Sequence, residues 1–269
     1  MGAHARQKRA AWDLPPAQRI CIWCDQSAAN AKTREHVVAE SLGGEGDYRL
    51  KGGLVCDPCN RTVLKSIDDQ MVLFGPLLSL RAHFGLAQDS KHVAQGIEFD
   101  LEQNEYTVDT TKLKHGNEVS FDPLRGEITS RISGPSPSAR SEHMTRGLHR
   151  IAYNVLAHHH GGPYVRGCFR FLRDLVLNLD AIMNRAFVLD QNPILPTLQA
   201  QVMSPTPTRW KSTAEIRNGS DGEPETVRIA IGPAIFHVSV RHSTTPLHAV
   251  VAATPNAIVY GVLDGDYVT

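Results

Sequence analysis

The sequence has 269 residues, a hydrophobic fraction of 41% and a formal net charge of zero. This length suits one large domain or two ordinary ones, and the composition is typical of a soluble globular protein. The balanced charge excludes a strongly basic whole-molecule field, so any nucleic-acid partner must be bound by a local basic surface. No apolar run approaches the roughly 18–20 residues that span a membrane, and the polar start lacks the apolar stretch of a secretory signal. We therefore expect a cytoplasmic protein without a membrane partner.

Residues 1–20 are predicted to form a basic N-terminal arm, in which Pro15-Pro16 disfavours a helix. A cysteine-bounded unit follows over residues 21–75. Four of the five cysteines occur in it as two pairs, Cys21/Cys24 and Cys56/Cys59. In a chain without an export signal, such pairs indicate metal ligands before disulfides. The fifth, Cys168, is expected to be buried on a helix.

The two cysteine pairs predict a structural zinc site. Zn²⁺ prefers four tetrahedral ligands, and a two-residue gap lets a tight turn direct both sulfurs of a pair at one ion. Two such pairs complete the ligand shell and leave no position for water, so the ion would hold the frame together rather than react. Structural zinc contributes on the order of 10 kcal/mol of apparent folding energy in small modules.

The segment between and after these pairs carries polar residues in a specific order. Arg34-Glu35-His36 comes first, Leu42-Gly43-Gly44 follows, and Asn60 stands directly after the fourth cysteine. This order resembles the HNH endonucleases with a four-cysteine zinc site, in the branch that carries Glu-His where others carry Asp-His. The resemblance covers about residues 21–70.

The resemblance implies a ββα-metal fold, in which two strands and a helix surround one catalytic cation. It also implies that Glu35 and Asn60 hold Mg²⁺ or Mn²⁺ and that His36 is the general base. The chemistry of these side chains agrees, since a histidine titrates near neutral pH and oxygen donors suit Mg²⁺. One departure bears on catalytic strength more than on the identity of the module: no asparagine lies about five residues before Cys56, where many members carry one that orients the catalytic histidine.

Asn60 is expected on the first turn of a helix. Asp57 is predicted as the N-cap and Pro58 as a first-turn residue. The helix is then expected to bury one side. That side carries Val63, Leu64, Ile67 and Met71. Asp68 and Asp69 are expected to be solvated.

Residues 76–269 are predicted to form a mixed accessory region. Alternating apolar residues predict strands over about 95–132 and again over about 225–263, with a hairpin turn at Gln103-Asn104. Apolar residues at helical spacing predict helices over about 142–180. The expected fold class is α+β, with an N-terminal zinc-bound ββα-metal module followed by helices and an antiparallel sheet.

Several basic residues leave alternatives open. Arg34, Arg61 and Lys65 lie near the predicted site and are candidates for gripping substrate phosphates. Arg166, Arg170 and Arg173 share a helix face and are either solvated or bind phosphates. The run His158-His159-His160 fans out around a helix and is not expected to chelate one ion.

These observations predict a metal-dependent endonuclease that hydrolyses phosphodiester bonds in nucleic acid, most readily DNA. The alternative is a zinc-binding module that binds nucleic acid or protein without catalysis, which would need neither Glu35, His36 nor Asn60. A redox switch built on the cysteine pairs is a third and weaker alternative.

Overall fold

The computed structural model describes residues 14–15, 18–44, 46, 48–72, 77, 141–182, 185–190 and 211–264, and the backbone of five short strands between residues 91 and 131. It combines helices with antiparallel sheets, so the expected α+β class is confirmed at this level. The predicted basic arm lies mostly outside the described residues. Among the described helices, none is both long and apolar enough to cross a membrane.

The N-terminal part is built of loops and one continuous helical run. After the short 3₁₀ turn η2 (Glu40–Leu42), the run consists of α2 (Asp57–Cys59), the π-helical turn η3 (Asn60–Leu64) and α3 (Lys65–Met71). The helix begins one residue earlier than predicted, with Cys56 rather than Asp57 at the N-cap. The N-cap prediction for Asp57 was wrong because its carboxylate accepts hydrogen bonds from the backbone of Lys32 and Thr33 instead.

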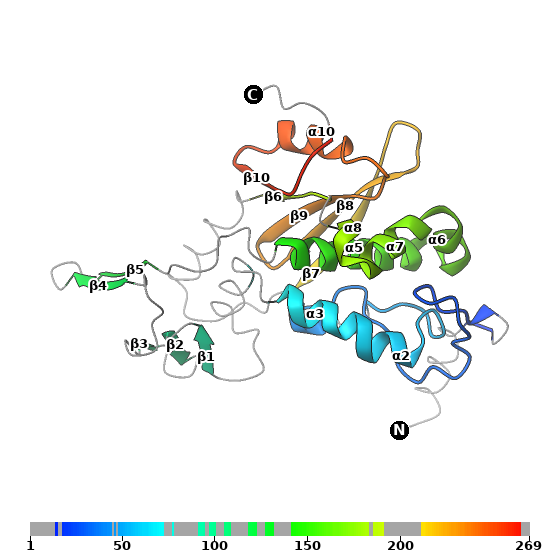
Figure 1. Ribbon diagram of the computed structural model, residues 1–269, viewed down its shortest axis with the longest axis horizontal. Helices are drawn as coiled ribbons and strands as arrows, with labels where there is room; N and C mark the ends of the chain where they lie inside the picture. The colour runs from blue at the N-terminus through cyan, green and yellow to red at the C-terminus, as the bar shows by residue number, and fades with distance from the viewer. Residues whose placement is uncertain are drawn as a thin grey trace.

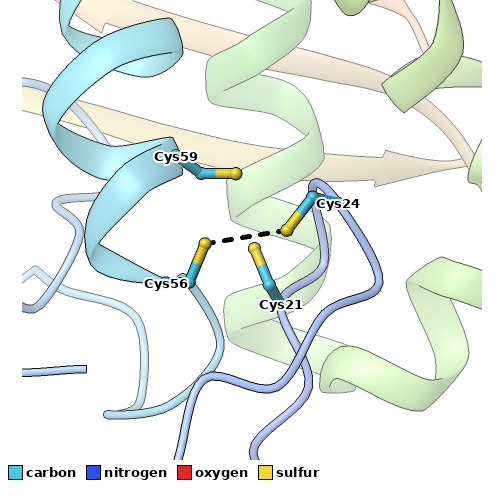
Figure 2. A group of neighbouring side chains, drawn as sticks. All are labelled: Cys21, Cys24, Cys56 and Cys59. Atoms are coloured by element: carbon cyan, nitrogen blue, oxygen red, sulfur yellow. Dashed lines mark hydrogen bonds between the residues drawn. The ribbon is translucent and has the colours of Figure 1, made fainter. Parts of the chain in front are cut away.

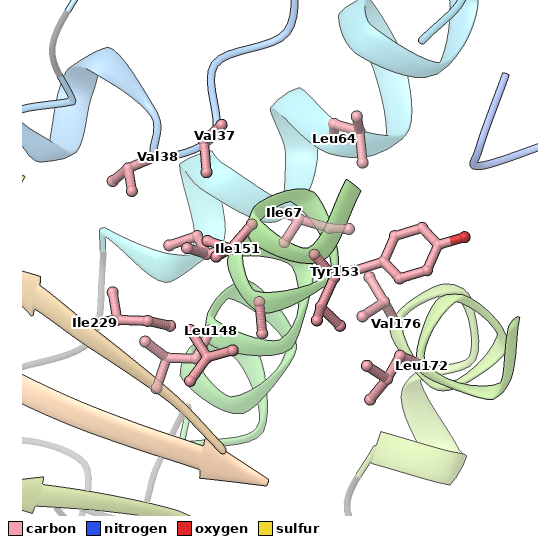
Figure 3. Packing of buried hydrophobic residues seen from close by; sticks show 14 of the residues in the cluster. Val37, Val38, Leu64, Ile67, Leu148, Ile151, Tyr153, Leu172, Val176 and Ile229 are labelled. Carbon is pink, nitrogen blue, oxygen red and sulfur yellow. The ribbon is translucent and has the colours of Figure 1, made fainter. Parts of the chain in front are cut away.

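Helix α5 (Ser141–His160) occupies the centre of the molecule. It packs on α3 and on the strands of the large sheet, so it lies between them (Figure 1), while Gly44 also forms a direct backbone bridge to Ser212 of that sheet. It is followed by α6 (Gly162–Cys168), α7 (Arg170–Leu177) and α8 (Leu179–Ile182). Figure 3 shows Leu148 and Ile151 of α5 among buried side chains from both neighbours.

The large sheet has five antiparallel strands in the order β10-β6-β9-β8-β7. The strands are β6 (Phe187–Asp190), β7 (Ser212–Asn218), β8 (Pro224–Ile231), β9 (Ala234–Ser239) and β10 (Ala257–Tyr260), and α10 (Pro246–Ala253) precedes the last. In β8 the alternate residues Val227, Ile229 and Ile231 are buried, which gives the sheet one apolar face against α5.

The remaining strands are short and antiparallel. A three-stranded sheet contains β1 (Lys91–Ala94), β2 (Ile97–Asp100) and β3 (Glu105–Val108), and β4 (Glu118–Asp122) pairs with β5 (Glu127–Arg131). Strands β2 and β3 flank the expected turn at residues 103–104, with Asp100 opposite Glu105.

Two predictions for the helices after α5 were wrong. Cys168 is exposed because α6 ends there, rather than continuing with Cys168 on its buried side. The proposed arginine face is interrupted at Phe169, whose φ of −122° and ψ of 21° separate α6 from α7. Arg173 is buried and forms an ion pair with Asp25, whereas Arg170 is exposed.

Candidate active site and cysteine cluster

The four paired cysteines come together at one point (Figure 2). Their sulfur atoms all lie within 4.8 Å of one another, and Cys24 Sγ lies 3.6 Å from Cys56 Sγ. Four sulfurs around a Zn²⁺ with bonds of about 2.3 Å would be separated by about 3.8 Å. All four are free thiols, so the cluster is a site that can hold a zinc ion.

The close spacing of the four thiols makes their joint deprotonation depend on a bound cation. A hydrogen bond from Cys59 lowers the pKa of Cys21 to about 5, while burial raises the pKa of Cys24 to about 11. The pKa of Cys59 is raised mainly through its hydrogen bond to Cys21. Thiolates packed this closely repel one another, so all four can deprotonate together only when a cation compensates their charge.

The loop that carries the first cysteine pair is anchored on α5. The ring of Trp23 meets the ring of Tyr153 edge to face at 4.9 Å, and the Tyr153 hydroxyl donates a hydrogen bond of 3.2 Å to the Ile22 carbonyl. The cysteine cluster is therefore fixed against the centre of the molecule as well as within its own segment.

His36 lies on a short antiparallel pairing between residues 35–37 and 48–50. The backbone nitrogen of Val37 donates to the Tyr48 carbonyl at 3.0 Å, and that of Leu50 donates to the Glu35 carbonyl at 2.8 Å, which places His36 opposite Arg49. Burial lowers the pKa of His36, and the guanidinium of Arg49 lowers it further. The imidazole is therefore neutral at neutral pH, and its buried Nε2 has no hydrogen-bond partner among the described residues.

Glu35 lies in a buried ionic network that includes two residues of α5. Its Oε1 accepts a hydrogen bond from Nη2 of Arg150 and another, at 3.4 Å, from Nδ2 of Asn154. The same Nη2 lies 3.2 Å from Asp68 Oδ2. Asp68 was expected to be solvated, and that prediction was wrong because the helix turns it towards Arg150. Both contacts of Glu35 use Oε1, and Oε2 takes part in neither.

Sequence reasoning missed Arg150 and Asn154. Both lie on α5, whose spacing of apolar residues predicts a helix but gives no sign that it packs against residue 35. Burial raises the pKa of Glu35, and the charge of Arg150 offsets this in part. Glu35 therefore has a structural role in this network.

Asn60 lies in η3, above the cysteine cluster, and is linked to the loop before Glu35. Its Nδ2 donates to Thr33 Oγ1 at 3.0 Å, and that hydroxyl donates to Asp57 Oδ1 at 2.6 Å. Among the described residues, no hydrogen bond or ion pair joins Asn60, Glu35 and His36 to one another directly. Glu35 and the backbone carbonyl of His36 both accept hydrogen bonds from Asn154 Nδ2, whereas Asn60 is bonded to Thr33 instead.

A basic pocket of about 530 Å³ lies beside these residues. It is lined by Arg19, Ala31, Lys32, Thr33, Arg34, Arg49, Gly52 and Gly53. Thr33 is the hydrogen-bond partner of Asn60, and Arg49 is the backbone neighbour of His36 across the short pairing. Asn60, His36 and Glu35 do not line the pocket themselves; Thr33 and Arg49 link its wall to Asn60 and His36. Of the predicted phosphate-binding residues, Arg34 lines it, Arg61 is exposed on η3, and Lys65 forms an exposed ion pair with Asp69 at 2.6 Å.

Comparison with protein-family models, curated proteins and solved structures finds no match to this chain. The family resemblance therefore stays a prediction from the order of the motifs. Among the described residues, the four cysteines are the one group of three or more His, Cys, Asp or Glu side chains close enough to share an ion. A second ion would need an amide oxygen, water or substrate oxygens in addition to a carboxylate.

Proposed function

We propose that this protein is a metal-dependent endonuclease of the HNH type that hydrolyses phosphodiester bonds in nucleic acid, with DNA as the preferred substrate. One observation carries the proposal: the basic pocket has Thr33, the partner of Asn60, and Arg49, the neighbour of His36, in its wall. A phosphate attracted into this pocket would meet Thr33 and Arg49, which connect the pocket wall to Asn60 and His36.

The proposed chemistry assigns a separate task to each residue. His36 accepts a proton from the attacking water, which a neutral imidazole can do at neutral pH. Glu35, through Oε2, and Asn60, through its carbonyl oxygen, would hold Mg²⁺ or Mn²⁺, which would stabilise negative charge on the phosphate. The positive side chains of the pocket orient the substrate. Cys21, Cys24, Cys56 and Cys59 would hold a zinc ion, which would tie the loop of Cys21 to the helix that carries Asn60.

A non-catalytic zinc-binding module that binds nucleic acid is the second candidate. The observation that favours it is the burial of Glu35 against Arg150, which gives this carboxylate a structural role without any catalytic ion. This candidate would also use the basic pocket, but it would not need His36.

Cleavage of a supercoiled plasmid with Mg²⁺ or Mn²⁺ distinguishes the two candidates. His36→Ala is expected to lower the cleavage rate by roughly 10²-fold to 10⁴-fold, the usual contribution of a general base. The control is His160→Ala, which removes an exposed histidine at the end of α5. Both variants should keep the zinc content and thermal midpoint of the parent protein. Equal cleavage by the parent and the His36 variant would remove the assignment of the base.

A further inference from the structure

The lining of the basic pocket is positively charged. Four of its lining residues are cationic, and none of the lining residues is acidic. Of the four, Arg19, Lys32 and Arg49 form no ion pair with any carboxylate of the described residues. Like charges gathered in a concave site repel one another, so a bound anion would stabilise them.

Backbone carbonyls hold the guanidinium of Arg19 in place. Arg19 donates from Nε to the Leu14 carbonyl at 2.6 Å and from Nη1 to the Ala29 carbonyl at 3.1 Å, so its positive charge is kept. Gly53 has a φ of +90°, and a Cβ atom there would lie 2.4 Å from Arg19 Cγ. Only glycine lets the arginine stem pack against this turn, and the stem in turn fixes the guanidinium at the pocket.

The second wall is fixed in a similar way. The carboxylate of Asp57 accepts hydrogen bonds from the backbone nitrogens of Lys32 and Thr33 at 3.1 and 3.0 Å. These contacts set the backbone while leaving the Lys32 side chain exposed. The guanidinium of Arg19 is held before a ligand arrives and would lose little freedom on binding, so this side of the pocket is organised for an anion.

We propose that this pocket binds the terminal phosphate monoester of a nucleic-acid strand. A phosphate monoester carries up to two negative charges at neutral pH, whereas each phosphodiester within a strand carries one. Three uncompensated cations therefore favour the monoester, and arginine and lysine are the residues that proteins use for phosphate. The volume of about 530 Å³ is in the range of small-ligand pockets, which suits one end of a strand better than a continuous backbone.

The identity of the strand rests on the proposed nuclease function, but binding of a phosphate monoester does not. Binding is therefore measured without a divalent catalytic ion, so that cleavage plays no part. The probes are one labelled oligonucleotide with a 5′-phosphate, a 3′-phosphate or only hydroxyl ends. Inorganic phosphate serves as an unlabelled competitor against the unmodified protein.

At least one phosphorylated strand is expected to bind about tenfold more tightly than the hydroxyl-ended strand, a difference of about 1.4 kcal/mol. Lys32→Glu should abolish this preference, whereas Arg217→Glu, which makes the same charge change on exposed β7, should keep it. Equal binding of all three strands, or equal losses in the two variants, would overturn the proposal. In another outcome, inorganic phosphate competes and the phosphorylated strand still binds more tightly, while no plasmid is cleaved. That combination would support the pocket and remove the nuclease function.

Discussion

Arg150 shows how one residue connects the candidate site to the rest of the molecule. Its side chain is 1% exposed and lies against the carboxylates of Glu35 and Asp68. It also donates a hydrogen bond of 3.4 Å to the carbonyl of Val37, the residue that follows the catalytic candidate His36 in the chain. Burial raises the pKa of both Glu35 and Asp68, so the two carboxylates depend on this one guanidinium to remain charged.

Replacing Arg150 should therefore cost more stability than its hydrogen bonds alone suggest. Arg150→Met keeps much of the side-chain volume but leaves two buried carboxylates without a counter-ion. Removing one partner of a buried ion pair costs about 3–5 kcal/mol, and we expect the free energy of unfolding in urea to fall by that amount. Arg217→Met removes an exposed arginine and should change the free energy of unfolding by less than about 0.5 kcal/mol. Similar losses in the two variants would contradict the role of Arg150.

The same residue marks the limit of what the sequence predicts about the site. The four cysteines were recognised from spacing alone, because two tight turns around one ion leave a local pattern. Arg150 and Glu35 are paired across 115 positions of the chain. Such a contact depends on how α5 packs, and a single sequence contains no local signal for that packing.

At the scale of elements, hydrophobic periodicity was informative where a face is buried and uninformative at element ends. Leu148, Ile151 and Val155 predicted the helix that α5 forms. The break at Phe169 and the exposure of Cys168 were missed, because no proline or run of glycines marks the point where α6 ends and α7 begins. Strand β7 was missed as well, since its alternation is weak at a sheet edge that is mostly exposed.

Helix α5 also carries a buried histidine that makes stability depend on pH. The ring of His149 is fully buried, and its Nδ1 lies 2.8 Å from the Thr145 carbonyl. Burial and the charge of Arg185 lower the pKa of His149 to about 3 in the folded protein. In the unfolded chain the pKa returns to about 6.5. Between these values only the unfolded chain binds the proton, so stability present above pH 6.5 is lost as the pH falls.

We expect this effect to appear as a difference between the parent protein and His149→Gln, whose side chain does not titrate. Between about pH 7 and about pH 5, the free energy of unfolding of the parent should fall by about 2 kcal/mol more than that of the variant. Urea unfolding at several pH values measures this difference, and any common effect of acid on the cysteine cluster cancels. Parallel pH profiles would show that His149 is protonated in the folded state.

At the scale of the whole molecule, α5 contacts both of the regions that were predicted from the sequence as separate parts of the chain. The chain was predicted to contain a module over residues 21–75 and a separate accessory region. Yet Leu64 and Ile67 of the first part belong to the same buried cluster as Ile151 of α5 and Ile229 of the sheet (Figure 3). A boundary with few contacts across it is expected between independent domains, and this cluster crosses the predicted one.

Loss of the metal should therefore affect α5 as well as the cysteine segment. Cys56→Ser removes one of four ligands, and structural zinc contributes on the order of 10 kcal/mol of apparent folding energy. When residues 21–71 lose their structure, α5 loses the apolar surface of α3 and the ion pair of Arg150, so its backbone amides should exchange hydrogen at least about tenfold faster. Hydrogen exchange measured separately for each segment of the chain gives these amide exchange rates. Cys168→Ser, at an exposed cysteine outside the cluster, should leave zinc content and exchange unchanged. Rapid exchange confined to residues 21–71, with α5 still protected, would instead mean that the module folds independently and that the predicted boundary near residue 75 is a true domain boundary.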